Sequence, residues 1–227
     1  ARRSGPRGPR SFAWLVALGV LNHSVLAGLR VDVSLDALAR GGSPATVGVL
    51  MALFALLPAI LSVSIGRLCD RTGVRSLLIL SSAALAVATA LPALLPGFVA
   101  LALTAAATGL AFGVFQIAAQ HATAQMGDPV DRVRRYTLLA LGYSVSGMAG
   151  PLVAGFGIDH AGHGATFALL AVIPLVPLAV LTSGRIALPA PAPHVDEGSA
   201  RGYFDLWRDP SMRRVLVLNA LFAIGWT

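Results

Sequence analysis

The sequence contains no lysine, one cysteine and few acidic residues, and each shortage excludes a class of protein. Charged residues make up 12% of the 227 residues, whereas a soluble domain carries roughly a quarter. Because Cys69 stands alone, it cannot form an internal disulfide or an all-cysteine metal site. A phosphate-binding loop of the ATPase type needs a lysine, so no such site is encoded. No nucleophile–base constellation is found either, and we expect no enzyme, no cofactor and no bound metal.

What the chain does have is apolar sequence, at 56% hydrophobic residues and a mean hydropathy of +0.77. A membrane-spanning helix needs about 20 consecutive, mostly apolar residues. Blocks of this length, rich in alanine and leucine, favour helices, and an open sheet facing lipid is excluded. Six such blocks cover residues 11–29, 45–65, 77–95, 98–119, 136–158 and 165–182, and a seventh begins at Val215. We therefore predict an all-α membrane protein with six transmembrane helices and a truncated seventh.

The basic residues predict how the chain is oriented in the membrane. The sequence pI near 11.2 is compatible with nucleic-acid binding, but the 17 basic residues are all arginines and gather in the segments between the blocks. Fifteen fall on one side of the predicted membrane, and only Arg30 and Arg40 fall on the other. Arginine-rich loops stay on the cytoplasmic side. We expect an integral protein of a bacterial plasma (inner) membrane, with a cytoplasmic amino terminus and no nucleic-acid partner.

Three regions follow from this pattern. Residues 1–183 form a six-helix transmembrane half, residues 184–213 a cytoplasmic linker, and residues 214–227 the start of helix seven. In residues 188–193 every second residue is proline, so this segment should be extended. Residues 203–208 place Tyr203 and Trp207 among charged residues, which suits either a short amphipathic helix at the membrane surface or a disordered linker.

A weak internal repeat joins the two halves of this six-helix region. The same offset of 89 residues that aligns the first block with the fourth also aligns two sets of three residues. The first set is Gly66, Asp70 and Gly73, and the second is Gly155, Asp159 and Gly162. Because three blocks separate the copies, the two three-helix repeats have opposite orientation in the membrane, as in many transporter folds.

The connection between the second and third blocks carries the most specific motif. It consists of Gly66, Asp70, Arg71, Gly73 and Arg75 at defined spacing. The glycines permit a tight reversal, and the charged residues should form a cluster at the membrane surface. An ordinary positively charged loop is the alternative.

Residues 66–75 resemble the signature loop of major facilitator transporters. The resemblance implies twelve spans in two six-helix halves and a central solute site. It also implies that the five motif residues are gating residues, which form a cytoplasmic gate and tie the halves together there. The missing carboxy-terminal six-helix half is then an expected partner, beside the lipid bilayer and a small-molecule substrate.

The fifth block is rich in small residues at four-residue spacing. Two stripes run along it, Gly142, Ser146, Gly150 and Ala154 on one and Gly147, Pro151 and Gly155 on the other. Small residues let helices pack closely in membranes. Residues 150–155 are similar to the helix-five motif of drug–proton antiporters in the same superfamily, although Ala154 and Ser146 stand where glycine is usual.

Polar residues inside the apolar blocks are candidates for a substrate or proton pathway, because such residues are costly in a membrane. They are Asn22, His23, Gln116, Gln120, Tyr143 and Ser146. His23 can bind substrate or relay protons, or it can simply bond to a neighbouring helix. We expect no acidic residue deep within the six blocks, so proton coupling would rest on His23 or on the missing half. Asp159, His160 and His163 are residue types that bind metals, but two histidines and a carboxylate often occur together by chance.

Together these features predict a secondary transporter that moves a small solute by alternating access, with proton-coupled efflux as the first choice. Uptake by a symporter or uniporter of the same family is one alternative. The other is a transporter-like protein that scaffolds a membrane complex without transporting anything.

Overall fold

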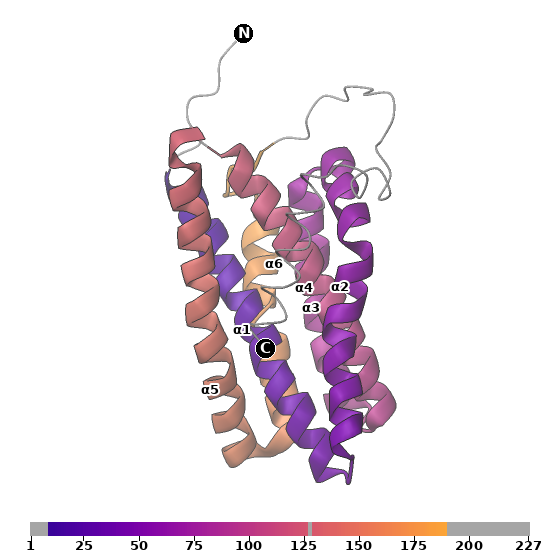
Figure 1. The fold of residues 1–227 in the computed structure, drawn as a ribbon. Coiled ribbons are helices and arrows are strands. Elements are labelled where there is room, and N and C mark those ends of the chain that lie inside the picture. The colour runs from indigo at the N-terminus through magenta and orange to yellow at the C-terminus, as the bar shows by residue number, and fades with distance from the viewer. Residues whose placement is uncertain (1–8, 127–128, 190–227) are drawn as a thin grey trace. The chain divides into compact units, whose positions relative to one another are not determined.

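The computed structural model describes residues 9–126 and 129–189, and throughout these residues the regular structure is helical, with no strand. Figure 1 shows long helices that run side by side in a bundle. Most of the predicted linker and the predicted start of helix seven lie outside the described residues. The helices are α1 (Pro9–Ala39), α2 (Pro44–Thr72), α3 (Val74–Leu94), α4 (Phe98–Gln125), the short 3₁₀ turn η1 (Pro129–Asp131), α5 (Arg132–Val172) and α6 (Leu175–Thr182).

Five of these helical segments are long and apolar enough to cross a membrane. The last of them, Arg132–Thr182, has 51 residues, which is about 76 Å of helix and more than twice the bilayer core. It is interrupted at Gly162, whose φ of 76° is not helical. Figure 1 shows α5 descending along one side of the bundle and the chain returning towards α6. The predicted fifth and sixth blocks therefore fall on two arms of one segment, residues 132–161 and 163–182.

Turns at glycine define two ends of the bundle. At one end, which we call the Gly162 end, Gly41 (φ 81°), Gly97 (φ 140°) and Gly162 reverse the chain. At the other, the Gly73 end, α2 gives way to α3 at Gly73, with φ 78° and ψ 153°. Only glycine adopts such positive φ angles without strain. These residues therefore set where each helix stops and the next begins.

Several predicted boundaries were wrong, since α4, for example, ends at Gln125 and not at Ala119, and two of the errors concern charged residues. The first helix was expected to end at Leu29 and instead continues to Ala39, so that it includes Asp32 and Asp36. Their exposed fractions are 0% and 3%, so two acidic side chains are buried in the bundle just beyond the predicted first block. Hydropathy treats a charge as the end of a span, but a charge with a partner can be buried.

The second error concerns the segment expected to form a loop at residues 66–75. Helix α2 runs through Gly66 and Asp70 as far as Thr72, and only Gly73 breaks it. Its N–H bonds to the Cys69 carbonyl at 3.1 Å and closes the last turn of α2. A Cβ on Gly66 would meet nothing within 4 Å. The predicted reversal therefore lies at Gly73 alone.

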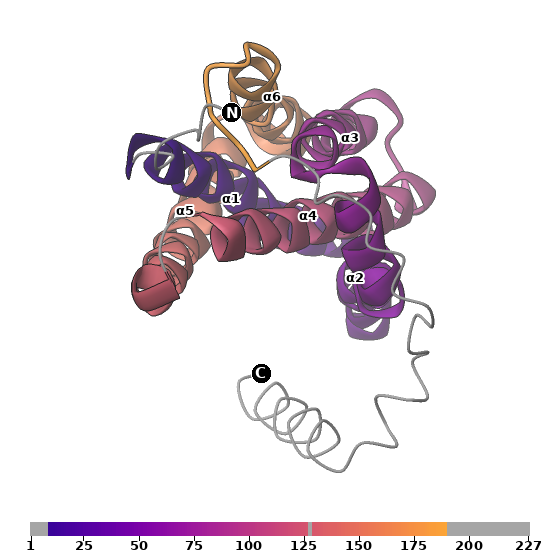
Figure 2. The same ribbon diagram turned by 90° about the horizontal axis from the view of Figure 1, so that it is seen from above.

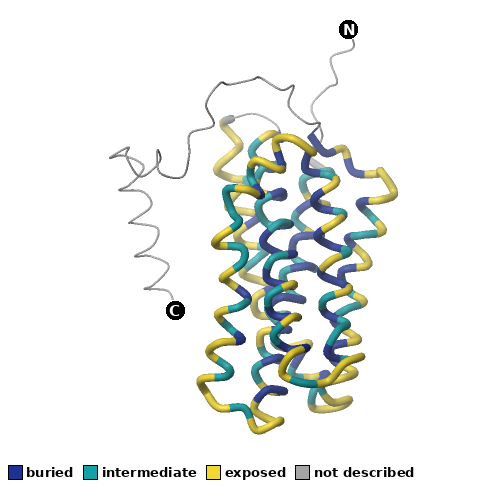
Figure 3. Tube along the Cα trace, turned by 90° about the vertical axis from the view of Figure 1, so that its right-hand side faces the viewer, coloured by how far each residue is buried: buried dark blue, intermediate teal, exposed yellow. Residues whose placement is uncertain are grey.

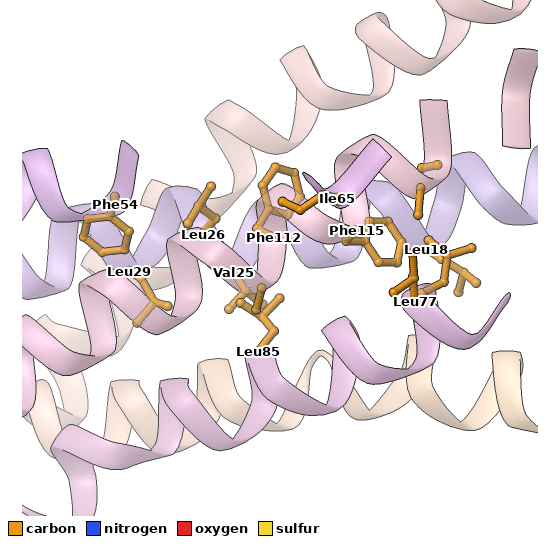
Figure 4. Close-up of a cluster of buried hydrophobic side chains, with 14 of the residues drawn as sticks. Leu18, Val25, Leu26, Leu29, Phe54, Ile65, Leu77, Leu85, Phe112 and Phe115 are labelled. Atoms are coloured by element: carbon orange, nitrogen blue, oxygen red, sulfur yellow. The ribbon is translucent and has the colours of Figure 1, made fainter. Parts of the chain in front are cut away.

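The bundle is filled along its axis by aliphatic and aromatic side chains. Helix α1 packs against α5, while α4 contacts both α2 and α3, so α4 occupies the middle of the view from above (Figure 2). Leu18 and Leu29 of α1, Phe54 of α2, Leu85 of α3 and Phe115 of α4 are almost completely buried (Figure 4).

Buried positions lie towards the inside of the bundle and exposed positions around its outside (Figure 3). The outside is nevertheless apolar: Ile60 of α2 is 62% exposed, and Leu152 and Phe156 of α5 are 66% and 68% exposed. Water would disfavour so much exposed apolar surface, whereas lipid tails accept it. The length of the helices and this surface make the chain an integral membrane protein.

Candidate functional site

Helices α1 and α5 make a very close contact where two glycines meet. A Cβ placed on Gly28 would lie 2.8 Å from the Gly150 carbonyl oxygen, and one on Gly150 would lie 2.8 Å from the Gly28 nitrogen. Real Cβ atoms do not come so near to backbone atoms, so neither position has room for a side chain. The two backbones touch here, as small residues allow in membrane helices.

The two predicted small-residue stripes of α5 behave differently. Ser146, Gly150 and Ala154 of the first stripe are buried, and a Cβ on Gly142 would reach Val20 of α1 at 3.0 Å. This stripe faces α1.

The second stripe is open in the described structure. A Cβ on Gly147 would find His23 Cε1 at 3.9 Å, and one on Gly155 would meet nothing within 4 Å. The close packing expected at Gly147 and Gly155 is therefore not made by the described residues. Pro151 and Gly155 line a shallow, open depression together with Phe156 and Leu169.

Three of the predicted pathway residues come together beside this open stripe. The Nδ1 atom of His23 on α1 lies 2.7 Å from the Ser146 hydroxyl on α5. That hydroxyl in turn donates to the Tyr143 carbonyl at 2.8 Å. Because the single hydroxyl proton is used, neutral His23 must donate from Nδ1, which leaves its Nε2 as an acceptor.

Aromatic rings surround this histidine. The ring centroids of Phe112 on α4 and of Tyr143 each lie 5.2 Å from that of His23. The Tyr143 hydroxyl is buried and has no hydrogen-bond partner among residues 9–126 and 129–189. Helices α1, α4 and α5 therefore place a polar and aromatic group in the apolar bundle, which we call the His23 group: His23, Phe112, Tyr143 and Ser146.

The other predicted pathway residues do not join it. Asn22 is fully buried and donates to the Ser82 hydroxyl of α3 at 3.0 Å, so it ties α1 to α3. Gln116 is half-buried, one turn of α4 beyond Phe112. Gln120 is exposed, and its backbone carbonyl accepts from the Tyr136 hydroxyl at 3.1 Å.

At the Gly73 end the predicted gating residues face different neighbours and form no single cluster. Asp70 of α2 lies 3.4 Å from His121 Nε2 of α4, with side chains 64% and 30% exposed respectively. Arg75 of α3 points to the end of α6, where its Nη1 donates to the Leu181 carbonyl at 2.8 Å. Its Nη2 donates to the Ile186 carbonyl. The predicted charged cluster is thus two contacts, one from α2 to α4 and one from α3 to the end of α6.

Sequence reasoning missed the most deeply buried carboxylates of the chain's described part. Asp32 of α1 lies 2.6 Å from His163 Nδ1, and Asp36 lies 2.9 Å from Arg40 Nε. A signal was available: residues 32, 36 and 40 recur every four positions and so share one face of a helix. The prediction failed because the helix was ended at Leu29.

The three residues that invited a metal site are not brought together. His163 turns inward to Asp32, while the exposed His160 donates from Nδ1 to the Phe156 carbonyl at 2.9 Å and stacks on the Phe156 ring. Asp159 is exposed. Within the residues described, no group of three or more His, Cys, Asp or Glu side chains is placed to hold a metal ion.

Comparison with known proteins agrees with this architecture. A bacterial homologue of the human lysosomal transporter Spinster, solved in an inward-facing and unoccupied conformation, superposes with a TM-score of 0.73 at 17% sequence identity. The match covers 90% of this chain and 49% of that one, so the chain spans about half the length of the solved transporter. No curated protein matches the sequence. The sequence model of the Major Facilitator Superfamily matches residues 13–227, and the chain therefore belongs to the Major Facilitator Superfamily.

Proposed function

We propose that the full-length protein is a secondary transporter that moves a small solute by alternating access, and that it exports this solute in exchange for protons. The observation that carries the proposal is the His23 group. Hydrogen-bonding groups inside a membrane bundle are costly unless they serve a purpose. Here they gather on α1, α4 and α5, beside the stripe of α5 that the described residues leave open.

The second half of the transporter is the proposed partner of that open face. The chain matches 49% of a complete transporter, and Gly147, Pro151 and Gly155 are small enough for another helix to pack closely against them. In this arrangement the His23 group borders a cavity between the halves, and the Nε2 acceptor of His23 is available to a solute.

We also propose that the chain contains two inverted three-helix repeats, with the two arms of α5 and α6 supplying the fifth and sixth spans. The corresponding glycines of the repeat support this. Gly73 has φ 78° and ψ 153°, and Gly162 has φ 76° and ψ 172°. Both interrupt helices with nearly the same backbone conformation, as equivalent turns would. On this proposal the arginine-rich Gly73 end faces the cytoplasm.

The proposed direction of transport is supported by a different observation from the one that supports transport itself. Export is favoured by the resemblance of residues 150–155 to the helix-five motif of drug–proton antiporters. Uptake by symport or uniport requires the same fold, and a non-transporting scaffold requires no solute site at all. In a scaffold, the His23 group would serve only to join α1 to α5.

Flux measurements test these choices. Purified full-length protein would be reconstituted into liposomes with the pH indicator pyranine trapped inside, and a panel of small solutes would be added outside. We expect at least one solute to move protons, and His23→Gln to reduce that flux several-fold. His160→Gln is the matched control, because His160 is exposed and bonds within its own helix. Absence of flux for every solute and every proton gradient would contradict transport.

A further inference from the structure

One buried ionisable pair has no place in the His23 group or in the gate. Asp32 has an exposed fraction of 0%, and its Oδ1 lies 2.6 Å from Nδ1 of His163. The His163 side chain is 24% exposed. The two residues are 131 positions apart in the chain, and His163 directly follows the turn at Gly162. The pair therefore joins α1 to the start of the second arm at the Gly162 end.

The charge of this pair depends on one proton. With His163 neutral, its Nδ1–H gives Asp32 a hydrogen bond, but the pair keeps a net charge of −1 in a buried place. A buried charge without compensation is strongly unfavourable. One added proton makes the pair neutral overall, whichever residue carries it. The second carboxylate oxygen, Oδ2, has no hydrogen-bond partner among the described residues, so little else stabilises the negative charge.

The neighbouring charges on α1 and α5 do not neutralise Asp32. On α1, Asp36 is already paired with Arg40 at 2.9 Å, and the Arg30 guanidinium lies over the Phe54 ring at 5.8 Å from its centroid. On α5, Asp159 and His160 are exposed, and His160 bonds to its own helix.

The other elements packed against α1 carry their ionisable residues at the far end. In the described residues, the ionisable groups of α2, α3, α4 and the end of α6 all lie at the Gly73 end. These are Arg67, Cys69, Asp70, Arg71, Arg75, His121 and Arg185. The Tyr143 hydroxyl of α5 lies midway along the bundle. Within the described chain, the net charge at this place thus depends on whether the Asp32–His163 pair holds a proton.

We propose that Asp32 and His163 form a proton-binding site that fastens α1 to the turn at Gly162. Because the protonated pair is neutral, the fastening is strong at acidic pH and weakens as pH rises and the proton leaves. His163 is the partly exposed member, so the proton enters and leaves through its imidazole. The proton site stands on its own geometry. Its use as a pH-dependent fastening in alternating access rests on the proposed transport function.

A double-mutant cycle in the full-length protein tests the site without any substrate. The variants are Asp32→Asn, His163→Gln and the two combined, and the readout is the thermal unfolding temperature Tm in detergent at about pH 5.5 and about pH 8, on either side of the usual histidine range. At the acidic pH we expect each single variant to lower Tm by roughly 5–10 °C. The double variant should lower it by little more. At the alkaline pH this coupling should be much smaller.

Matched controls separate the pair from general pH effects. Asp159→Asn and His160→Gln change an exposed carboxylate and an exposed histidine in the same turn region, and both should leave the pH dependence of Tm unchanged. If the double variant keeps the wild-type difference in Tm between the two pH values, the proposal is overturned.

Hydrogen exchange gives a second readout if Asp32→Asn fails to fold. In the wild type, amides of residues 30–38 and 160–168 should be better protected at acidic pH, after correction for the intrinsic pH dependence of exchange. His163→Gln should remove that difference. Equal protection at both pH values would refute the site. A pair-dependent pH effect in a protein without solute flux would keep the proton site and refute the transport proposal, and flux without such an effect would do the reverse.

Discussion

Two Asp–His pairs join helices at opposite ends of this bundle, and they differ mainly in burial. Asp32 and His163 lie 2.6 Å apart with exposed fractions of 0% and 24%. Asp70 and His121 lie 3.4 Å apart with exposed fractions of 64% and 30%. Exposed ion pairs contribute little because water and salt screen them, whereas breaking a buried pair leaves a charge that nothing compensates. The same two residue types therefore hold the helices firmly at one end and loosely at the other.

At the loosely paired end, Arg75 provides the stronger contact. Its guanidinium donates to the Ile186 carbonyl beyond α6. It also donates to the Leu181 carbonyl in the last turn of α6, where helix carbonyls lack intrahelical partners. A cation at a helix carboxyl terminus also interacts favourably with the helix dipole. The Gly73 end therefore combines a firm contact from α3 with an exposed pair between α2 and α4.

The largest difference in stability between the two ends should appear when the histidine of each pair is removed in turn. His163→Ala leaves the Asp32 carboxylate buried without a partner, and we expect the free energy of unfolding to fall by about 3–5 kcal/mol. His121→Ala removes an exposed partner and should cost about 1 kcal/mol or less. Thermal unfolding of the two variants in the same detergent measures the difference. Equal losses would show that burial does not distinguish the two ends.

The next effect concerns Arg75. Lysine keeps the charge but cannot reach two carbonyls with a planar fork, so Arg75→Lys should lower the free energy of unfolding by about 1.5–3 kcal/mol. Arg71→Lys, at an exposed position in the same motif, is the control and should stay within about 0.5 kcal/mol. The measurement is again thermal unfolding. A neutral Arg75→Lys would mean that charge alone serves the contact.

Asp70 should matter for flux more than for stability. Asp70→Asn is expected to leave insertion and Tm nearly unchanged, because the aspartate is exposed, while solute flux falls several-fold if Asp70 acts in a gate. Asp159→Asn is the matched control, since Asp159 is the counterpart of Asp70 in the proposed repeat. Unchanged flux in Asp70→Asn would refute the gating role and leave the His121 contact as a minor surface pair.

The smallest expected effect is the change in the two pair couplings when the salt concentration is raised. Screening is strong for exposed charges and weak for buried ones. Raising the salt concentration should therefore reduce the Asp70–His121 coupling, which is at most about 1 kcal/mol, and leave the Asp32–His163 coupling nearly intact. Double-mutant cycles at low and high salt measure both. A strong salt dependence at Asp32 would show that water reaches the carboxylate.

Much of the fold was predictable because each apolar block is long and contiguous. The helical spans and the turn at Gly73 follow from block length and from glycine's freedom at positive φ. The end of α1 was not predictable in the same way. Arg30 and Asp32 look like the start of a loop, and only the partner at His163, far away in sequence, makes a buried charge acceptable.

In the candidate site, too, the residues were predictable from the sequence but their contacts were not. His23, Tyr143 and Ser146 were singled out as polar residues in apolar blocks, and their meeting across α1 and α5 depends on the close approach of Gly28 and Gly150. The two small-residue stripes of α5 are equivalent in sequence, and a helix pattern alone gives no reason to prefer either.

By itself the sequence determined the class of protein, an all-helical membrane bundle, and the turn at Gly73, because hydropathy and backbone freedom are local properties. Only the tertiary structure decided which stripe of α5 packs on α1, where Arg75 points, and that Asp32 meets His163. Those contacts join residues more than a hundred positions apart, and the burial that gives each its strength exists only once the helices have packed.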